Sequence, residues 1–205
     1  KTYSLNSKKI HIEIDPSEIN KNVPVDIALI GDLKTVLRKL LPILNKQSNS
    51  NWIDRISEWS KESQSRDIIN MDTQMLYGAQ VISDIWKETN GDAIVVSDVG
   101  QHQMLEAQYY KHDEPNTLLT SGGLGTMGFS LPAAIGASFS NRDKDIWVIV
   151  GDGSIQMTIT ELATAVQENA NIKIAIINNG YLGMVRQWQQ LFYDSRYSET
   201  PISSP

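Results

Sequence analysis

The feature that most constrains the fold is a pair of short apolar runs, residues 146–150 and 172–177, with a helical pattern between them. In the intervening residues 158–167, apolar side chains recur three or four positions apart, which is typical of an amphipathic helix. A strand, a helix and a second strand in this order favour a parallel pair joined by a right-handed crossover. We therefore expect an α/β unit with a parallel sheet.

The same alternation extends over most of the chain. Further strands and helices are expected at residues 10–14, 25–29 and 93–97 (strands) and 33–41, 52–61 and 132–139 (helices). Another helix is expected from about Asp72, whose carboxylate suits an N-cap, and it would place Met75 and Trp86 on one face. Helices that alternate with short apolar strands predict an α/β fold with a parallel sheet flanked by helices on both faces.

A polar stretch at residues 45–51 divides the chain. It contains no hydrophobic residue to anchor it, so we expect an exposed linker and a domain boundary near residue 50. Residues 1–50 are then a small α/β remnant of one domain, and residues 51–205 form a second domain. The first residue is not methionine and the last residues show no helix or strand pattern, so we expect a fragment that is truncated at both ends.

Composition argues against several classes of protein. The chain has 18 Lys+Arg against 24 Asp+Glu, and this formal charge of -6 disfavours nucleic acid as a partner. It has no cysteine, which excludes disulfides and thiolate metal sites. Its apolar runs are far shorter than the roughly 20 residues that a membrane-spanning helix needs. We therefore expect a cytoplasmic protein without a membrane or nucleic-acid partner.

Polar motifs follow two neighbouring strands of the predicted sheet. Gly151-Asp152-Gly153-Ser154 comes directly after one strand, and Asn178-Asn179-Gly180 follows the next. The carboxyl ends of parallel strands meet at one edge of a sheet, where ligands bind, so we expect Asp152 and Asn179 to face one ion. Their oxygens suit Mg²⁺, which commonly shares its coordination shell with phosphate oxygens.

The glycines of this motif favour a phosphate site. Gly151 and Gly153 permit a close backbone approach, and the N–H groups of Gly153 and Ser154 are expected to face phosphate oxygens near the start of the next helix. Gly-Asp-Gly alone also fits an ordinary turn. Its pairing with the two asparagines after the next strand makes the binding site the better interpretation.

This pairing resembles the Gly-Asp-Gly to Asn-Asn signature of thiamine-diphosphate enzymes. Residues 99–104, 122–132 and 183–190 resemble segments of the acetolactate synthase catalytic subunit, and residues 12–16 and 22–25 resemble the end of its central, FAD-binding domain. The resemblance covers nearly the whole chain. It implies that residues 1–50 are a remnant of that central domain with a linker, and that residues 51–205 are the domain that binds the diphosphate side of thiamine diphosphate.

The resemblance also implies roles for individual residues. Asp152 and Asn179 would bind Mg²⁺ through their side chains and Tyr181 through its backbone carbonyl, although many relatives carry an acidic residue or glutamine in the Gly180-Tyr181 region. Met127 would hold the cofactor in its bent form, and Trp188 would shape the pocket for the second 2-ketoacid. The other implied cofactor-binding residues are Gly100, Gln101, His102, Gly125, Gly151, Gly153, Ser154, Gly183 and Met184.

Simpler interpretations remain open for some of these positions. Periodicity alone would make Met184, Val185 and Trp188 the buried stripe of a helix, and His102 fits a polar loop residue. The resemblance implies FAD contacts near residues 13–14 and 31–32, which a strand end and a turn explain equally well.

The implied reaction is the decarboxylation of pyruvate and its ligation to a second pyruvate or to 2-ketobutyrate, in branched-chain amino acid biosynthesis. Thiamine diphosphate, Mg²⁺ and, in the full-length protein, FAD are the implied cofactors. The activating glutamate of that family lies in an N-terminal domain outside this chain, so the catalytic residue is unknown here and the fragment alone is expected to be inactive.

The implied partners are 2-ketoacids, the protein's own N-terminal domain and a second catalytic subunit, with a regulatory subunit left open. Two alternatives to the synthase remain. One is another thiamine-diphosphate enzyme, of the pyruvate oxidase or glyoxylate carboligase type, against which residues 183–188 argue. The other is a non-catalytic cofactor-binding module.

Overall fold

The structure, a computed structural model, describes residues 3–70 and 74–203. These fall into two compact units, Lys1–Ser60 and Lys61–Pro205. The division lies inside helix α2 (Ser50–Ser65), whereas residues 45–49 are exposed and have no regular structure. The linker expected at 45–51 thus gives way to helix at Ser50, and a domain boundary near residue 50 stays a prediction.

The first unit contains a parallel pair of strands, β1 (Ile10–Glu13) and β2 (Ile27–Ile30), followed by helix α1 (Leu33–Leu40). Two short 3₁₀ helices, η1 (Pro16–Glu18) and η2 (Leu41–Ile43), lie between and after them. Asp32 caps α1 by accepting a hydrogen bond from the Thr35 N–H at 2.8 Å. The expected α/β character is confirmed here, with the second strand shifted from 25–29 to 27–30.

The second unit is built on a parallel sheet. Its strand order is β4-β3-β5-β6, from β3 (Ile94–Ser97), β4 (Leu118–Thr120), β5 (Ile146–Gly151) and β6 (Lys173–Ile177). All three pairings are parallel, with Ile94 opposite Ile146 and Trp147 opposite Lys173. The strands expected at 93–97, 146–150 and 172–177 are confirmed. Strand β4 was not predicted.

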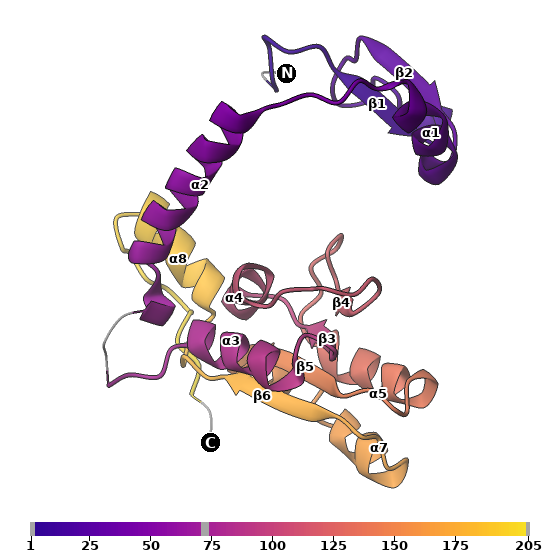
Figure 1. Ribbon diagram of the computed structural model, residues 1–205. Helices are drawn as coiled ribbons and strands as arrows, with labels where there is room; N and C mark the ends of the chain where they lie inside the picture. Colours follow the sequence, from indigo (N-terminus) through magenta and orange to yellow (C-terminus); the bar gives the residue numbers. More distant parts are fainter. Residues whose placement is uncertain (1–2, 71–73, 204–205) are drawn as a thin grey trace. The chain divides into compact units, whose positions relative to one another are not determined.

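Helices cover both faces of this sheet, as Figure 1 shows. Helices α3 (Gly78–Thr89) and α4 (Gln101–Tyr109) lie on one face, and α5 (Ser130–Ser140) and α7 (Glu161–Gln167) lie on the other. Helix α6 (Asp152–Gln156) begins directly after β5, and α8 (Gly183–Phe192) follows β6. A short 3₁₀ helix, η3 (Ile68–Asn70), precedes α3. The predicted fold class, a parallel sheet flanked by helices on both faces, is confirmed.

The two faces of the sheet carry alternate residues of each strand, as its pleat requires. Val95 and Ile149 pack with Ile82 and Ile85 of α3. Their neighbours on the opposite face pack with α5, and that cluster comprises Ile94, Val96, Ala134, Ala137, Ile146, Val148, Val150 and Ile155. The central strands β3 and β5 are therefore buried on both sides, which holds their carboxyl ends in fixed positions.

Two helix predictions differ from the structure. The helix expected from Asp72 begins only at Gly78, so Met75 lies before it; Asp72 itself is outside the described residues. At this start the Gln80 side chain accepts a hydrogen bond from the Tyr77 N–H at 2.9 Å. The helix expected at 158–167 begins at Glu161, because a turn follows α6.

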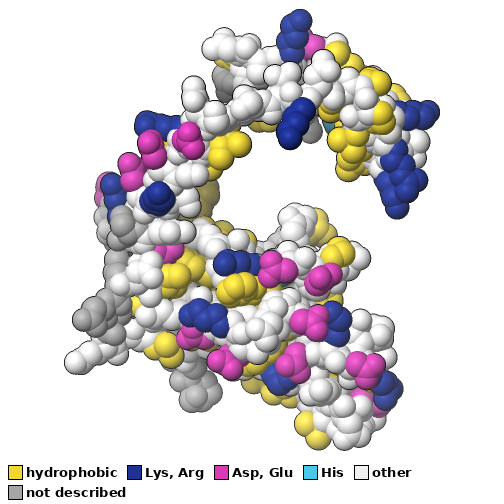
Figure 2. All heavy atoms as spheres, viewed as in Figure 1, with side chains coloured by type: hydrophobic (Ala, Val, Ile, Leu, Met, Phe, Trp, Pro, Cys, Tyr) yellow, Lys and Arg dark blue, Asp and Glu magenta, His cyan; other side chains and the backbone are white. Residues whose placement is uncertain are grey.

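No helix in the described part of the chain is both long and apolar enough to cross a membrane. Figure 2 shows Lys and Arg side chains interspersed with Asp and Glu over the visible face.

Candidate functional site

A cavity of about 230 Å³ lies at the carboxyl edge of the sheet of the second unit. Its lining includes every residue predicted to bind thiamine diphosphate or Mg²⁺, namely Gly100, Gln101, His102, Gly125, Met127, Gly151, Asp152, Gly153, Ser154, Asn179, Tyr181, Gly183 and Met184. Val99, Ile177, Leu182 and Val185 also line it. The structure thus brings together residues that follow all four strands of the sheet, including the glycine-rich loop between β4 and α5. Their roles toward a cofactor stay predictions.

Asp152 is the first residue of α6 and is 4% exposed. Its Oδ2 atom is buried and has no hydrogen-bond partner among the described residues. An orphaned carboxylate oxygen is costly to bury unless a cation or a donor satisfies it. The chemistry of this position therefore fits a metal ligand.

Asn179 follows β6 at the same edge of the sheet and also lines the cavity. Its Oδ1 accepts a hydrogen bond from the Tyr181 N–H at 3.0 Å, and its Nδ2 donates to Gln101 Oε1 at 3.3 Å. These bonds fix which end of the amide is oxygen and leave that oxygen a second lone pair for a cation. The described residues contain no group of three or more His, Cys, Asp or Glu side chains arranged for a metal. Asp152 and Asn179 would therefore need further oxygens, from backbone and from a bound diphosphate, to complete the six-coordinate shell of Mg²⁺.

His102 is 6% exposed and lies in the first turn of α4, so the interpretation as a polar loop residue is wrong. Burial lowers its pKa to about 4, although the charges of Asp98 and Asp152 oppose that shift. The imidazole is therefore neutral near pH 7. Its Nε2 has no hydrogen-bond partner among the described residues, so it is available to a ligand in the cavity.

Three glycines of the cavity lie very close to other side chains of the chain itself. A β-carbon on Gly151 would lie 2.9 Å from His102 Nδ1, and one on Gly153 would lie 2.5 Å from Ile202 Cδ1. A β-carbon on Gly183 would overlap Gln101 Oε1. The sequence interpretation assigned Gly151 and Gly153 to close approach by a ligand. The structure shows in addition that a β-carbon on Gly151 would crowd the buried His102 ring, whereas one on Gly153 would meet the end of the flexible Ile202 side chain.

Asp98 is a residue of this edge that the sequence interpretation missed. It directly follows β3, as Asp152 follows β5, and it is fully buried. Burial would raise its pKa, but hydrogen bonds from Ser130, Val99 and Gly128 outweigh burial and lower the pKa below its usual value. An aspartate placed immediately after a buried strand was the signal that could have identified it.

The segment around Thr200 was also missed. It pairs antiparallel with the loop after β6, with the Leu182 N–H donating to Thr200 O and the Ile202 N–H donating to Gly180 O, both at 2.8 Å. Thr200 is 1% exposed. These two hydrogen bonds flank Tyr181 and hold the backbone of the loop in which the Tyr181 carbonyl was predicted to bind a metal.

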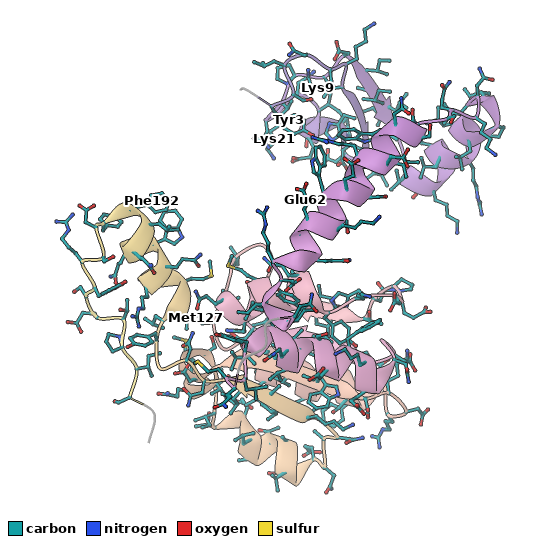
Figure 3. The ribbon with its side chains drawn as sticks, turned by 60° about the vertical axis from the view of Figure 1, so that its left-hand side comes forward. Tyr3, Lys9, Lys21, Glu62, Met127 and Phe192 are labelled. Atoms are coloured by element: carbon teal, nitrogen blue, oxygen red, sulfur yellow. The ribbon has the colours of Figure 1, made fainter. Side chains whose placement is uncertain are left out.

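Helix α8 carries Met184 into the cavity lining but leaves Trp188 outside it. Trp188 is 59% exposed and packs against Phe192, with ring centroids 5.1 Å apart. No residue of α8 is buried among the described residues, so the interpretation of a buried stripe is wrong. Figure 3 shows Met127 near the start of α8 and Phe192 at its other end. The role of Trp188 in a substrate pocket stays a prediction.

Positions 13 and 32, where FAD contacts were implied, have local structural roles. The Glu13 carboxylate accepts hydrogen bonds from the N–H groups of Ile14 and Asp15, and Asp32 caps α1. These bonds support the interpretation as a strand end and a turn.

Two protein-family models match this chain. Residues 98–205 match the family model described as thiamine pyrophosphate enzyme, C-terminal TPP binding domain, and residues 1–40 match the central domain of thiamine pyrophosphate enzymes. The chain belongs to the thiamine pyrophosphate enzyme family. Its cavity lies within the part matched by the TPP binding domain, which supports thiamine diphosphate as the ligand of this thiamine pyrophosphate enzyme.

Curated relatives of this thiamine pyrophosphate enzyme include three acetolactate synthase large subunits. The chain is 42% identical to isozyme 3 of Escherichia coli (strain K12), 43% to that of Haemophilus influenzae and 47% to that of Corynebacterium glutamicum. Each match covers 98% of this chain but only 36%, 36% and 33% of the relative, respectively. The resemblance to acetolactate synthase catalytic subunits is confirmed, and the chain spans about a third of the length of these relatives.

Proposed function

We propose that this chain is the part of an acetolactate synthase that binds Mg²⁺ and the diphosphate end of thiamine diphosphate. The observation that carries the proposal is the convergence on one cavity of all the residues predicted to bind thiamine diphosphate or Mg²⁺. Its volume of about 230 Å³ lies below the roughly 300–1,000 Å³ of typical whole-ligand pockets. A site that holds one end of the cofactor, with the other end bound by a second domain, accounts for that size.

Each side of the cavity offers chemistry that fits this ligand. Asp152 Oδ2 and Asn179 Oδ1 are the side-chain oxygens for Mg²⁺, and the Tyr181 carbonyl is the proposed backbone ligand. Met127 and Met184 provide an apolar wall for the thiazolium side. When bound, thiamine diphosphate supplies the electron sink for decarboxylation of a 2-ketoacid. The chain's own residues bind it and orient it.

The whole protein's reaction in this proposal joins pyruvate, after decarboxylation, to a second pyruvate or to 2-ketobutyrate, in branched-chain amino acid biosynthesis. The similarity to acetolactate synthase large subunits supports this reaction over the oxidase and carboligase alternatives. The proposal includes an N-terminal domain and a second catalytic subunit as partners, FAD as a further cofactor and a cytoplasmic location. The chain alone is then inactive.

The test is acetolactate formation from pyruvate by the complete protein that carries this chain, with Mg²⁺, thiamine diphosphate and FAD. Acetolactate is expected from the unchanged protein and is lost in Asp152→Ala. Asp143→Ala, which removes an exposed carboxylate of the same unit, is the matched control and retains activity. Release of CO₂ or acetate without acetolactate would assign the protein to the decarboxylase or oxidase group, and cofactor binding without turnover would favour the non-catalytic module.

A further inference from the structure

The buried carboxylate of Asp98 holds three backbone N–H groups from two separate segments. Its Oδ1 accepts from Val99 at 2.8 Å and from Gly128 at 2.9 Å, and its Oδ2 accepts from Ser130 at 2.8 Å. Three converging donors require an acceptor-only group, and an ionised carboxylate is the side chain that meets this requirement. Asp98 therefore ties the end of β3 to the glycine-rich loop and to the first turn of α5.

The peptide groups of Gly128 are held on both sides. Its N–H donates to Asp98 Oδ1, and its carbonyl accepts a hydrogen bond from Thr158 Oγ1 at 3.0 Å. Gly128 has φ +85°, and a β-carbon there would lie 3.0 Å from Thr158 Cγ2 and 3.1 Å from Met157 Cβ. The backbone at this point thus has little freedom to move.

The residue immediately before this held glycine is Met127, which lines the cavity. A methionine side chain has three rotatable bonds and adapts easily, so its location depends on where its backbone is fixed. Val99, whose N–H donates to Asp98, is also linked to α6, because Ser154 Oγ donates a hydrogen bond to the Val99 carbonyl at 3.2 Å. Asp98 and Thr158 lie outside the residues that line the cavity, and both act on Met127 through Gly128.

We propose that Asp98 and Thr158 are positioning residues. Asp98 binds the Gly128 N–H and Thr158 binds the Gly128 carbonyl, and together they fix the position of Met127 in the cofactor cavity. The proposal rests on the proposed function, in which Met127 supports bound thiamine diphosphate. A purely structural role would stabilise the fold without any effect on cofactor affinity, and this difference makes the two roles separable.

The first test compares Thr158→Val with Thr158→Ser in the complete protein. Valine keeps the shape of threonine but removes the hydroxyl donor, whereas serine keeps the donor. Thr89→Val is the matched control: the Thr89 hydroxyl donates to Ile85 O at 2.7 Å, but Thr89 does not line the cavity. The readouts are the Kd for thiamine diphosphate with Mg²⁺ by titration calorimetry, kcat and KM for pyruvate, and hydrogen exchange of residues 121–130 by mass spectrometry.

Loss of one neutral hydrogen bond predicts that Thr158→Val weakens cofactor affinity about 3- to 10-fold, while serine and the Thr89→Val control stay within about 2-fold. Exchange of residues 121–130 becomes faster in Thr158→Val only. A fall in kcat with KM for pyruvate little changed is expected, because Met127 would act on the bound cofactor and not on pyruvate. Unchanged affinity and unchanged exchange in Thr158→Val would overturn the proposal, as would an equal loss of affinity in Thr89→Val.

Asp98→Asn gives a second, stronger perturbation, since its amide group places a donor against one of the three N–H groups. We expect a loss of affinity of about 10-fold or more, because hydrogen bonds to charged groups contribute more than neutral ones. If the unchanged protein binds no thiamine diphosphate at all, the proposed function fails. The restraint of Gly128 is then judged by hydrogen exchange of residues 121–130 alone: faster exchange in Thr158→Val supports it and unchanged exchange overturns it.

Discussion

The imidazole of His102 lies against Gly151, so closely that a β-carbon at position 151 would be 2.9 Å from Nδ1. His102 lies in the first turn of α4, which follows β3, and Gly151 is the last residue of β5; the two strands are neighbours in the sheet. Because β3 and β5 pair in parallel, their carboxyl ends meet, and the side chain after one strand packs on the backbone at the end of the other. Both residues line the cavity.

Gly151→Ala is expected to destabilise the protein by about 1–3 kcal/mol, because the added methyl group overpacks against the buried His102 ring. Gly136→Ala is the matched control. Gly136 is exposed within α5 and has nothing within 4 Å of an added β-carbon, so alanine there is expected to stabilise by about 0.4–1 kcal/mol. Thermal or urea unfolding of the two variants measures both effects. Equal stabilities would contradict the packing described for His102.

Gly183→Ala is expected to act on ligand binding more than on folding. Its β-carbon would overlap Gln101 Oε1 and lie 2.8 Å from Asn179 Nδ2, so the hydrogen bond between these two side chains must shift. Displacement of the predicted Mg²⁺ ligand Asn179 should weaken Mg²⁺-dependent cofactor binding about 10-fold or more, equivalent to about 1.4 kcal/mol. Gly122→Ala, with open space around its β-carbon, serves as control in the same titration. A Kd unchanged in Gly183→Ala would show that Asn179 need not be held by Gln101.

Glu106 provides a test of pH dependence away from the cavity. It is 1% exposed on α4, and its Oε1 lies 2.5 Å from His112 Nε2. Burial raises its pKa above the ordinary value of 4.5, while the hydrogen bond and charge of His112 oppose the shift. A carboxyl group with a raised folded-state pKa contributes full stability below the unfolded pKa, and this contribution is lost as pH rises through the folded pKa.

Glu106→Gln removes that ionisation but keeps an oxygen for His112. Its free energy of unfolding relative to the unchanged protein should therefore increase as the pH rises above 4.5 and level off above the raised pKa. Denaturant unfolding at several pH values measures the difference, with the exposed Glu88→Gln as control. A difference that stays constant with pH would contradict a raised pKa at Glu106.

The sheet and the position of the cavity were predictable from the sequence because they depend on local patterns. Asp152 and Asn179 each lie two residues past the end of an apolar run, and the parallel pairing of those runs then places both at one edge. Strand β4 was not predictable in this way, since its three residues are too few to show a period. The register of the Thr200 segment depends on hydrogen bonds to Gly180 and Leu182, which no local pattern encodes.

In helix α8 a feature was predicted that the structure does not have. Its apolar spacing predicts a buried face, yet Trp188 is exposed, because nothing among the described residues covers that face. Periodicity indicates which side chains share a helix face, but it does not state whether a neighbour covers them.

The most direct measurement is the Mg²⁺ dependence of thiamine diphosphate binding to the complete protein, by titration calorimetry, for the unchanged protein, Asp152→Asn and Asp143→Asn. Binding by the unchanged protein and by Asp143→Asn should require Mg²⁺. Asp152→Asn, which keeps the shape of Asp152 but removes its charge, should weaken binding by about 100-fold or bring it below detection, because loss of a charged group from a buried site costs several kcal/mol. Thiamine diphosphate binding of equal strength in Asp152→Asn, or in the absence of Mg²⁺, would show that the cavity after β5 and β6 is not the site of the metal and the diphosphate.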